Sequence, residues 1–308
     1  FRQEWLPARD ALGTLHNTPF AGEALPRRAQ AKPRIQELLA FWRNPARALF
    51  RERWGIWLDE TGRIPDDSEP LELSGLEKHR LREDILRELL GAAEEAGTAR
   101  LLASGTLPHG AASRALIRHE QDRLLPLAER LREDTGPHAP QGVELPGELP
   151  VCGVLDRLHA GRLVDHVVSD KAKGRDLLAL WIRHLAGCAA GVLQGPSRLH
   201  DASRTHALPL LQPLRARELL SELVALREDG LSRALPFLPE ASWVFSESSD
   251  PDAARIAFLG SDFSRGDSDD PYLARVFGEW EDVPGEDFRE LSLRVFAPLH
   301  RCLGGEPP

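Results

Sequence analysis

Residues 153–171 read GVLDRLHAGRLVDHVVSDK, two apolar runs on either side of the turn His159-Ala160-Gly161. Short runs rich in Val and Leu that meet at a glycine-containing turn are typical of paired β-strands. We therefore predict strands at about 149–158 and 162–169, preceded by a third strand at about 142–145.

Polar residues stand near the ends of the two longer predicted strands. Asp156 lies near the end of the first, and Ser169 and Lys171 close the second. Alternate residues of a strand point to the same side, so positions 169 and 171 are predicted to share a face. Two carboxylates on neighbouring strands, with a lysine beside them, are the arrangement that lets a nuclease hold Mg²⁺ and activate water against a phosphodiester. Here a hydroxyl stands where the second carboxylate is required.

The missing carboxylate weighs against catalysis. Serine is a neutral, weak ligand for a hard divalent cation, and one carboxylate beside a lysine makes a poor Mg²⁺ site. Asp165 or Asp170 would replace it only if a β-bulge redirected one of them. Otherwise Asp156 and Lys171 form an ion pair or an exposed strand end. We predict no bound metal and no catalysis by this domain, with an active metal-dependent nuclease as the competing hypothesis.

Helical patterns surround the predicted strands. Apolar residues at helical spacing predict helices before and after the strand cluster, which indicates an α/β domain whose sheet is flanked by helices. The predicted helices cover 34–44, a second helix from Pro45, one capped by Ser74, and 111–132, 175–190, 214–228, 271–281 and 286–302. One or two strands are predicted near 196–208, and residues 243–263 alternate weakly. Residues 1–32 are predicted to be a linker or tail, and 33–308 the domain.

Composition excludes several classes of protein. No apolar run approaches the roughly 20 residues that span a bilayer, and none resembles a signal peptide, so we expect a cytoplasmic protein without membrane contact. The three cysteines show no metal-binding spacing, and no nucleotide-binding motif is present, so we expect no ATP binding. The chain contains no methionine. We therefore expect a fragment of a longer protein.

Charge is distributed unevenly. Residues 247–290 hold thirteen Asp and Glu and four Arg, which equals the whole net charge of −9. Residues 27–54 hold eight Lys and Arg against two Glu. A basic patch suits a phosphate backbone, although charge runs are more often solvated helix faces. We predict that the acidic segment faces a protein partner or the solvent.

Several stretches resemble the C-terminal region of the RecC family, the gamma subunit of exodeoxyribonuclease V. The most specific is AKGRDLLALWIRHL at 172–185. The others are LLAFWRNPARALFRER at 38–53, DSEPLELSGL at 67–76 and ASGTLPHG at 103–110. They occur in the family's order and cover most of 33–190, whereas the last hundred residues match only loosely.

The resemblance implies a fold similar to the restriction-endonuclease-like (PD-(D/E)XK-type) and RecB-type nucleases, with added helices at both ends. Active relatives have a Gly, a His four residues later, an Asp, and then acid-x-Lys. On this motif, Gly110, Asp156 and Lys171 are kept, Arg114 replaces the His and Ser169 replaces the second acid. The resemblance therefore implies a degenerate site with no catalytic residues.

The resemblance also implies partners and a role. The whole subunit would join RecB and RecD in an ATP-dependent helicase–nuclease of double-strand-break repair and recombination. It would help to split and channel double-stranded and forked DNA, while ATP and Mg²⁺ are used by the partner subunits and this domain needs no cofactor. A module that binds only proteins is the third hypothesis. Trp42 is expected in the core, and the candidates for DNA or subunit contact are Arg43, Arg47, Arg51, Arg53, Trp54 and Trp57.

Overall fold

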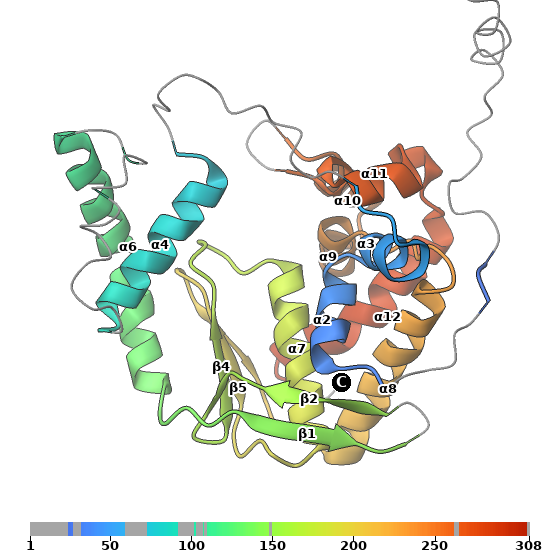
Figure 1. The fold of residues 1–308 in the computed structure, drawn as a ribbon, viewed down its shortest axis with the longest axis horizontal. Helices are drawn as coiled ribbons and strands as arrows, with labels where there is room; N and C mark the ends of the chain where they lie inside the picture. The colour runs from blue at the N-terminus through green and yellow to red at the C-terminus, as the bar shows by residue number, and fades with distance from the viewer. Residues whose placement is uncertain are drawn as a thin grey trace, which may run out of the picture.

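The computed structural model (Figure 1) describes residues 24–26, 32–58, 73–91, 102, 107, 110–147, 150–261 and 265–306. Most of the predicted linker 1–32 and residues 59–72 lie outside these ranges. Within the linker, the backbone N–H of Leu25 donates to the carbonyl oxygen of Ser232 at 2.7 Å, and Lys32 pairs with Glu144. The described parts of the linker therefore contact the domain.

In the described ranges six short strands form two sheets. Strand β1 (Gln141–Leu145) pairs antiparallel with β2 (Val151–Leu155), with Val143 opposite Gly153. The second sheet has the order β3-β4-β5-β6, in which β4 and β5 run parallel and the other pairs are antiparallel. Its strands are β3 (Leu158–His159), β4 (Arg162–His166), β5 (Ser197–His200) and β6 (Thr205–Leu208).

The predicted hairpin is confirmed, but its first strand is interrupted. Only Asp156 and Arg157 separate β2 from β3, and the N–H of Val164 already bonds the carbonyl of Arg157 at 3.0 Å. Ala160 and Gly161 turn the chain with φ of 46° and 76°, the positive values that a two-residue hairpin loop requires. The chain therefore leaves one sheet and enters the other at Asp156.

Helix α7 (Gly174–Ala189) connects β4 to the parallel β5 and packs against both sheets (Figure 1). A parallel pair needs such a crossover because a tight turn cannot join strands that run in the same direction. Leu177, Trp181 and Leu185 follow the predicted helical spacing and are buried. A Cβ on Gly174 would lie 2.4 Å from the ring of Trp243, so glycine lets the start of α7 pack closely on a later helix.

Most of the remaining helices lie together on one side of α7 and form with it the larger body of the domain (Figure 1). Those that the periodicity predicted are α2 (Ile35–Arg43), α3 (Pro45–Ala48), which continues as the π-helix η2 (Leu49–Trp54), α8 (Pro213–Gly230), α11 (Pro271–Phe277) and α12 (Gly285–Leu303). Short 3₁₀ turns, η3 (Asp267–Asp269) and η4 (Trp280–Asp282), lie on either side of α11. None of the helices in the described ranges is long and apolar enough to cross a membrane.

The weak alternation at 243–263 does not mark strands. This part of the chain forms two helices, α9 (Pro239–Ser248) and α10 (Pro251–Leu259). Each begins with a proline, which is favoured in the first helical turn because that turn has no partner for its N–H. The prolines therefore indicate the starts of these helices, whereas the weak alternation of apolar residues does not indicate strands.

Two helices form an arm on the other side of the sheets. Helix α4 (Gly75–Leu89) is capped by Ser74 as predicted and packs against the long α6 (Ala111–Asp134) (Figure 1). The arm has its own apolar cluster, which reaches the sheet through Val164 and Val168. Two other clusters fill the larger body: one beneath α2, α7, α8 and α12, and one among α3, η2, α9, α10 and α11. The α/β class predicted from the sequence is confirmed.

Candidate functional site

Asp156 lies at the bend between β2 and β3, and its side chain is exposed. Its carbonyl oxygen accepts a hydrogen bond from Nε2 of His138. In the described part of the chain no hydrogen bond or ion pair links the carboxylate to Ser169 or Lys171. The ion pair that the sequence left open is therefore not formed.

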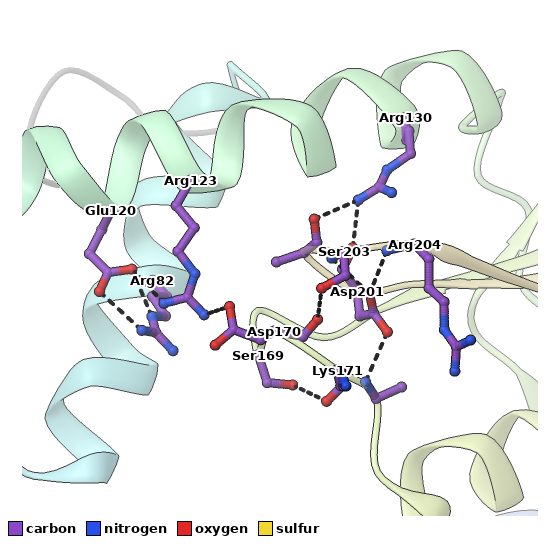
Figure 2. Close-up of polar contacts among 12 residues, drawn as sticks. Arg82, Glu120, Arg123, Arg130, Ser169, Asp170, Lys171, Asp201, Ser203 and Arg204 are labelled. Carbon is purple, nitrogen blue, oxygen red and sulfur yellow. Dashed lines mark hydrogen bonds and ion pairs between the residues drawn. The ribbon is translucent and has the colours of Figure 1, made fainter.

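Ser169 and Lys171 do not share a strand face, because β4 ends at His166. The two residues lie in an irregular turn, where the hydroxyl of Ser169 donates to the carbonyl oxygen of Lys171 at 3.0 Å (Figure 2). Ser169 is half-buried, whereas Lys171 is exposed. The predicted extension of the strand to residue 169 is therefore wrong. Ser169 and Lys171 lie in the turn that follows β4.

Neither nearby aspartate is an unpaired carboxylate. Asp165 is clamped between two guanidinium groups, with Arg157 at 3.0 Å and Arg183 at 3.2 Å. Asp170 forms an ion pair with Arg123 of α6 (Figure 2). A metal ion bound to either carboxylate would have to displace these arginines, because their positive charge repels a second cation. Among the described residues no three His, Cys, Asp or Glu lie close enough together to hold a metal ion.

Arg114, at the position of the family's histidine, lies far from this turn. It is exposed in the first turn of α6, which follows Gly110. At about 1.5 Å per residue, it lies roughly 13 Å along the helix axis from Arg123. No contact joins it to Asp156 or Lys171 in the described ranges. The structure therefore does not join the four degenerate positions into one cluster.

A residue that sequence reasoning missed organises the turn. Asp201, between β5 and β6, is fully buried, and its carboxylate accepts backbone hydrogen bonds from Ala172 at 2.9 Å, Ser203 at 2.8 Å and Arg204 at 2.7 Å (Figure 2). His206 adds a fourth bond at 3.0 Å. Burial acts to raise the pKa of Asp201, but these bonds outweigh it and the pKa lies below its usual value. Asp201 thus holds the segment after Lys171 as a buried anion.

The arm is tied to the same turn by charged groups. Arg130 of α6 donates to the carbonyl oxygens of Asp201 and Ala202 at 2.6 and 3.1 Å. Closer to the start of α6, the buried Glu120 accepts two hydrogen bonds from Arg82, at 2.8 and 3.0 Å, which join α4 to α6 within the arm (Figure 2). Arginines of the arm therefore bond the turn where a nuclease would need free carboxylates.

The basic segment supplies few unpaired cations. Arg47 pairs with Asp270 at 3.0 Å, and Arg51 donates to the hydroxyl of Tyr272 at 3.0 Å. Arg53 donates to the carbonyl oxygens of Leu231 and Pro26 at 2.7 and 2.6 Å. The acidic segment 247–290, predicted to face outward, thus neutralises part of the basic one.

Of the six residues predicted to contact DNA or a partner subunit, Arg43 and Trp57 are exposed. Arg43 ends α2 and is exposed, and Trp57 is 70% exposed with the guanidinium of Arg51 4.3 Å from its ring centre. Trp54 instead packs in an edge-on contact with Phe50 at 4.9 Å, and Trp42 is buried as expected.

Comparison with known proteins agrees with the resemblance seen in the sequence. Residues 30–250 match the family described as the RecC C-terminal domain. The chain is 28% identical over 324 residues to the RecBCD enzyme subunit RecC of Escherichia coli K12, which covers 98% of the chain and 28% of that protein. The Mycolicibacterium smegmatis subunit is 30% identical over 250 residues, covering 74% of the chain and 22% of that protein.

The corresponding subunit of Mycobacterium tuberculosis is 26% identical over 321 residues, covering 92% of the chain and 28% of that protein. The chain thus spans less than a third of the length of these relatives. The family match extends over most of the folded domain, from the segment before α2 to the end of α9. This chain belongs to the RecC C-terminal domain family.

Proposed function

We propose that this domain is a non-catalytic scaffold that helps a helicase–nuclease to split and channel duplex and forked DNA during double-strand-break repair and recombination. Its relatives are named as RecC subunits of the RecBCD enzyme, which supports RecB and RecD as its partners. In this proposal the motors and the nuclease, with their ATP and Mg²⁺, belong to those partners.

We also propose that the core is a restriction-endonuclease-like fold. The order of elements supports this: α6, then β1, β2 with β3, and β4 as successive antiparallel turns of the chain, then α7 and the parallel β5. Asp156, directly after β2, and Lys171, in the turn after β4, then follow the two strands whose ends carry the acids and lysine of such a fold.

The observation that carries the non-catalytic assignment is the state of the remaining carboxylates. With Ser169 in place of an acid, catalysis would need Asp165 or Asp170 beside Asp156, and both are ion-paired to arginines. Metal-assisted hydrolysis needs anionic ligands that are free to converge on the ion. The arginines favour a fixed structural role for these acids.

The test compares Asp156→Ala with Asp122→Ala, a second exposed carboxylate, on α6. The full-length protein is assembled with its partner subunits, and degradation of linear and forked DNA is followed with Mg²⁺ or Mn²⁺. We expect both variants to degrade DNA at the wild-type rate. Loss of cleavage in Asp156→Ala alone would identify an active nuclease site in this domain.

Binding of forked DNA separates the scaffold from a module that binds only proteins. Phosphate contacts weaken as salt rises, so binding by the full-length protein should fall steeply between low and physiological salt. Absence of binding at low salt would favour the protein-binding module.

A further inference from the structure

A cavity of about 460 Å³ lies where the starts of several helices meet, beyond the turn that contains Lys171. Its walls come from the junction of α2 and α3, from the start of α7, from the start of α9, and from the segment of η3 and α11. Its volume lies within the range of small-molecule sites, roughly 300–1,000 Å³. Five basic side chains line it: Arg43, Arg47, Lys173, Arg175 and Arg265.

Carboxylates also line the cavity, but each is held by the fold. Asp270 caps α11 through the N–H groups of Tyr272 and Leu273 at 3.0 and 3.2 Å, and it pairs with Arg47. Asp269 accepts the N–H of Gly266 at 3.0 Å. The acidic wall is thus built from capping groups that point back into the backbone.

The two remaining acids, Glu240 and Asp267, do not neutralise all the basic side chains of the cavity. Glu240 is the shared ion-pair partner of Lys173, at 3.5 Å, and Arg175, at 3.7 Å. Asp267 accepts the N–H groups of Glu240 and Ala241 at 3.1 and 2.9 Å, and burial raises its pKa to about 7, so near neutral pH it carries only part of a charge.

Two arginines in the cavity make no ion pair with the described residues. Arg43 and Arg265 are both exposed, and neither guanidinium has a hydrogen-bond or ion-pair partner in those ranges. Guanidinium groups bind phosphate oxygens with two parallel hydrogen bonds, a geometry that Lys cannot supply. An anion with several oxygens would satisfy both groups together.

An aromatic platform adjoins the cavity. Arg47, in the cavity wall, lies 5.5 Å from the ring centre of Tyr272, and Arg51 lies 5.3 Å from the same ring. Arg51 also stacks at 4.3 Å on Trp57, which is 70% exposed. A basic groove with an exposed aromatic face is the combination that single-stranded nucleic acid binds, because only an unpaired base offers its face for stacking.

We propose that this cavity binds a backbone phosphate of single-stranded DNA, with Trp57 as the stacking platform for a nearby base. The inference rests on the proposed function only in taking DNA as the polymer. Lys171, Lys173 and Arg175 are all exposed and stand at alternate positions. They extend the basic surface from the cavity back to the degenerate nuclease site.

The first experiment measures binding of a fluorescent oligo(dT) strand and of a duplex to the full-length protein over a range of salt. Arg43→Ala with Arg265→Ala removes the two unpaired cavity arginines. Arg289→Ala with Arg301→Ala removes two exposed arginines from α12 as the matched control. We expect the cavity variant to bind the single strand at least ten-fold more weakly, and its salt slope to be smaller by about 0.7 for each phosphate that the arginines no longer neutralise. The control should bind as the wild type does.

Trp57→Ala should weaken single-strand binding by about five-fold or more, since stacking is lost. A strand that carries 5-iodouracil should also form a photocrosslink to Trp57 in the assembled complex, located by mass spectrometry. This second readout does not depend on whether partner subunits bind the same strand.

The outcomes separate this inference from the proposed function. A wild-type protein that binds no DNA would overturn both. Wild-type binding with a cavity variant equal to its control, and no crosslink at Trp57, would overturn the cavity alone. Unchanged DNA binding with loss of a partner subunit would show that the cavity takes an acidic protein segment. An equal loss for duplex and single strand would overturn the single-strand assignment.

Discussion

Asp201 and Asp267 are both buried, yet the domain treats their charge in opposite ways. Asp201 receives four hydrogen bonds, and although burial acts against its charge, its pKa is lowered. Asp267 receives bonds from two backbone N–H groups, which do not offset its burial, and the nearby Glu240 and Asp270 disfavour its charge further. Burial acts against the charge of both carboxyls, and the comparison shows that the number of donors and the neighbouring charge help to decide whether such a group stays ionised.

The two carboxyl groups therefore have different roles. Asp201 is a permanent anion that fixes the turn after Lys171. Asp267 is a group whose charge changes near neutral pH, in the wall of a basic cavity. Three substitutions test how much each carboxylate contributes, two at these residues and one at an exposed aspartate.

The largest effect is expected for Asp201→Ala. Four donors would lose their acceptor in a buried site, which costs about 3–5 kcal/mol of stability. Because the pKa of Asp201 is lowered on folding, its contribution is present above about pH 4 and is lost as the pH falls through the folded value. Urea denaturation at pH 7 measures the loss, with Asp122→Ala as the exposed control. Equal stability of the two variants would remove Asp201 from its structural role.

A smaller effect of opposite sign is expected at Asp267. Its pKa is raised to about 7, so the folded protein holds a proton that the unfolded chain has released, and stability falls as the pH rises from about 4 to about 7. Between pH 5 and pH 7 this amounts to about 2–3 kcal/mol, at 1.36 kcal/mol per unit. Asn keeps an acceptor for the α9 N–H groups without the charge. Asp267→Asn should therefore flatten this part of the stability profile, and a slope identical to that of the wild type would contradict the raised pKa.

The smallest effect is expected for Asp170→Asn, in the same turn as Lys171. The side chain is 71% exposed, and exposed ion pairs contribute about 0–1 kcal/mol. Thermal unfolding at low and high salt should show a small loss that salt removes. A loss as large as that of Asp201→Ala would mean that the arm depends on this surface pair.

The sequence predicted the elements whose cause is local. Helices α2 and α7 follow from apolar residues at helical spacing, and the hairpin at Ala160-Gly161 follows from its turn residues. Helices α9 and α10 are short and weakly periodic, and only the prolines at their starts announce them.

The site was less predictable because its causes are distant in the chain. Asp201 lies 29 residues from Ala172, and nothing local to Ser169 indicates that β4 stops at His166. Arg47 and Asp270 are 223 residues apart, so two segments that look like separate basic and acidic surfaces become one cavity wall. The distribution of charge along the chain does not show which charged segments will lie side by side in the fold.

The arm of α4 and α6 has a consequence for how the domain comes apart. Its apolar cluster reaches the sheet only through Val164 and Val168 among the described residues, while the larger body has clusters of its own. Regions that are sparsely packed against the rest open as separate cooperative units, at a lower free energy than global unfolding. We therefore expect the arm to open at a lower free energy than the larger body, with faster hydrogen exchange in α4 and α6 than in α7.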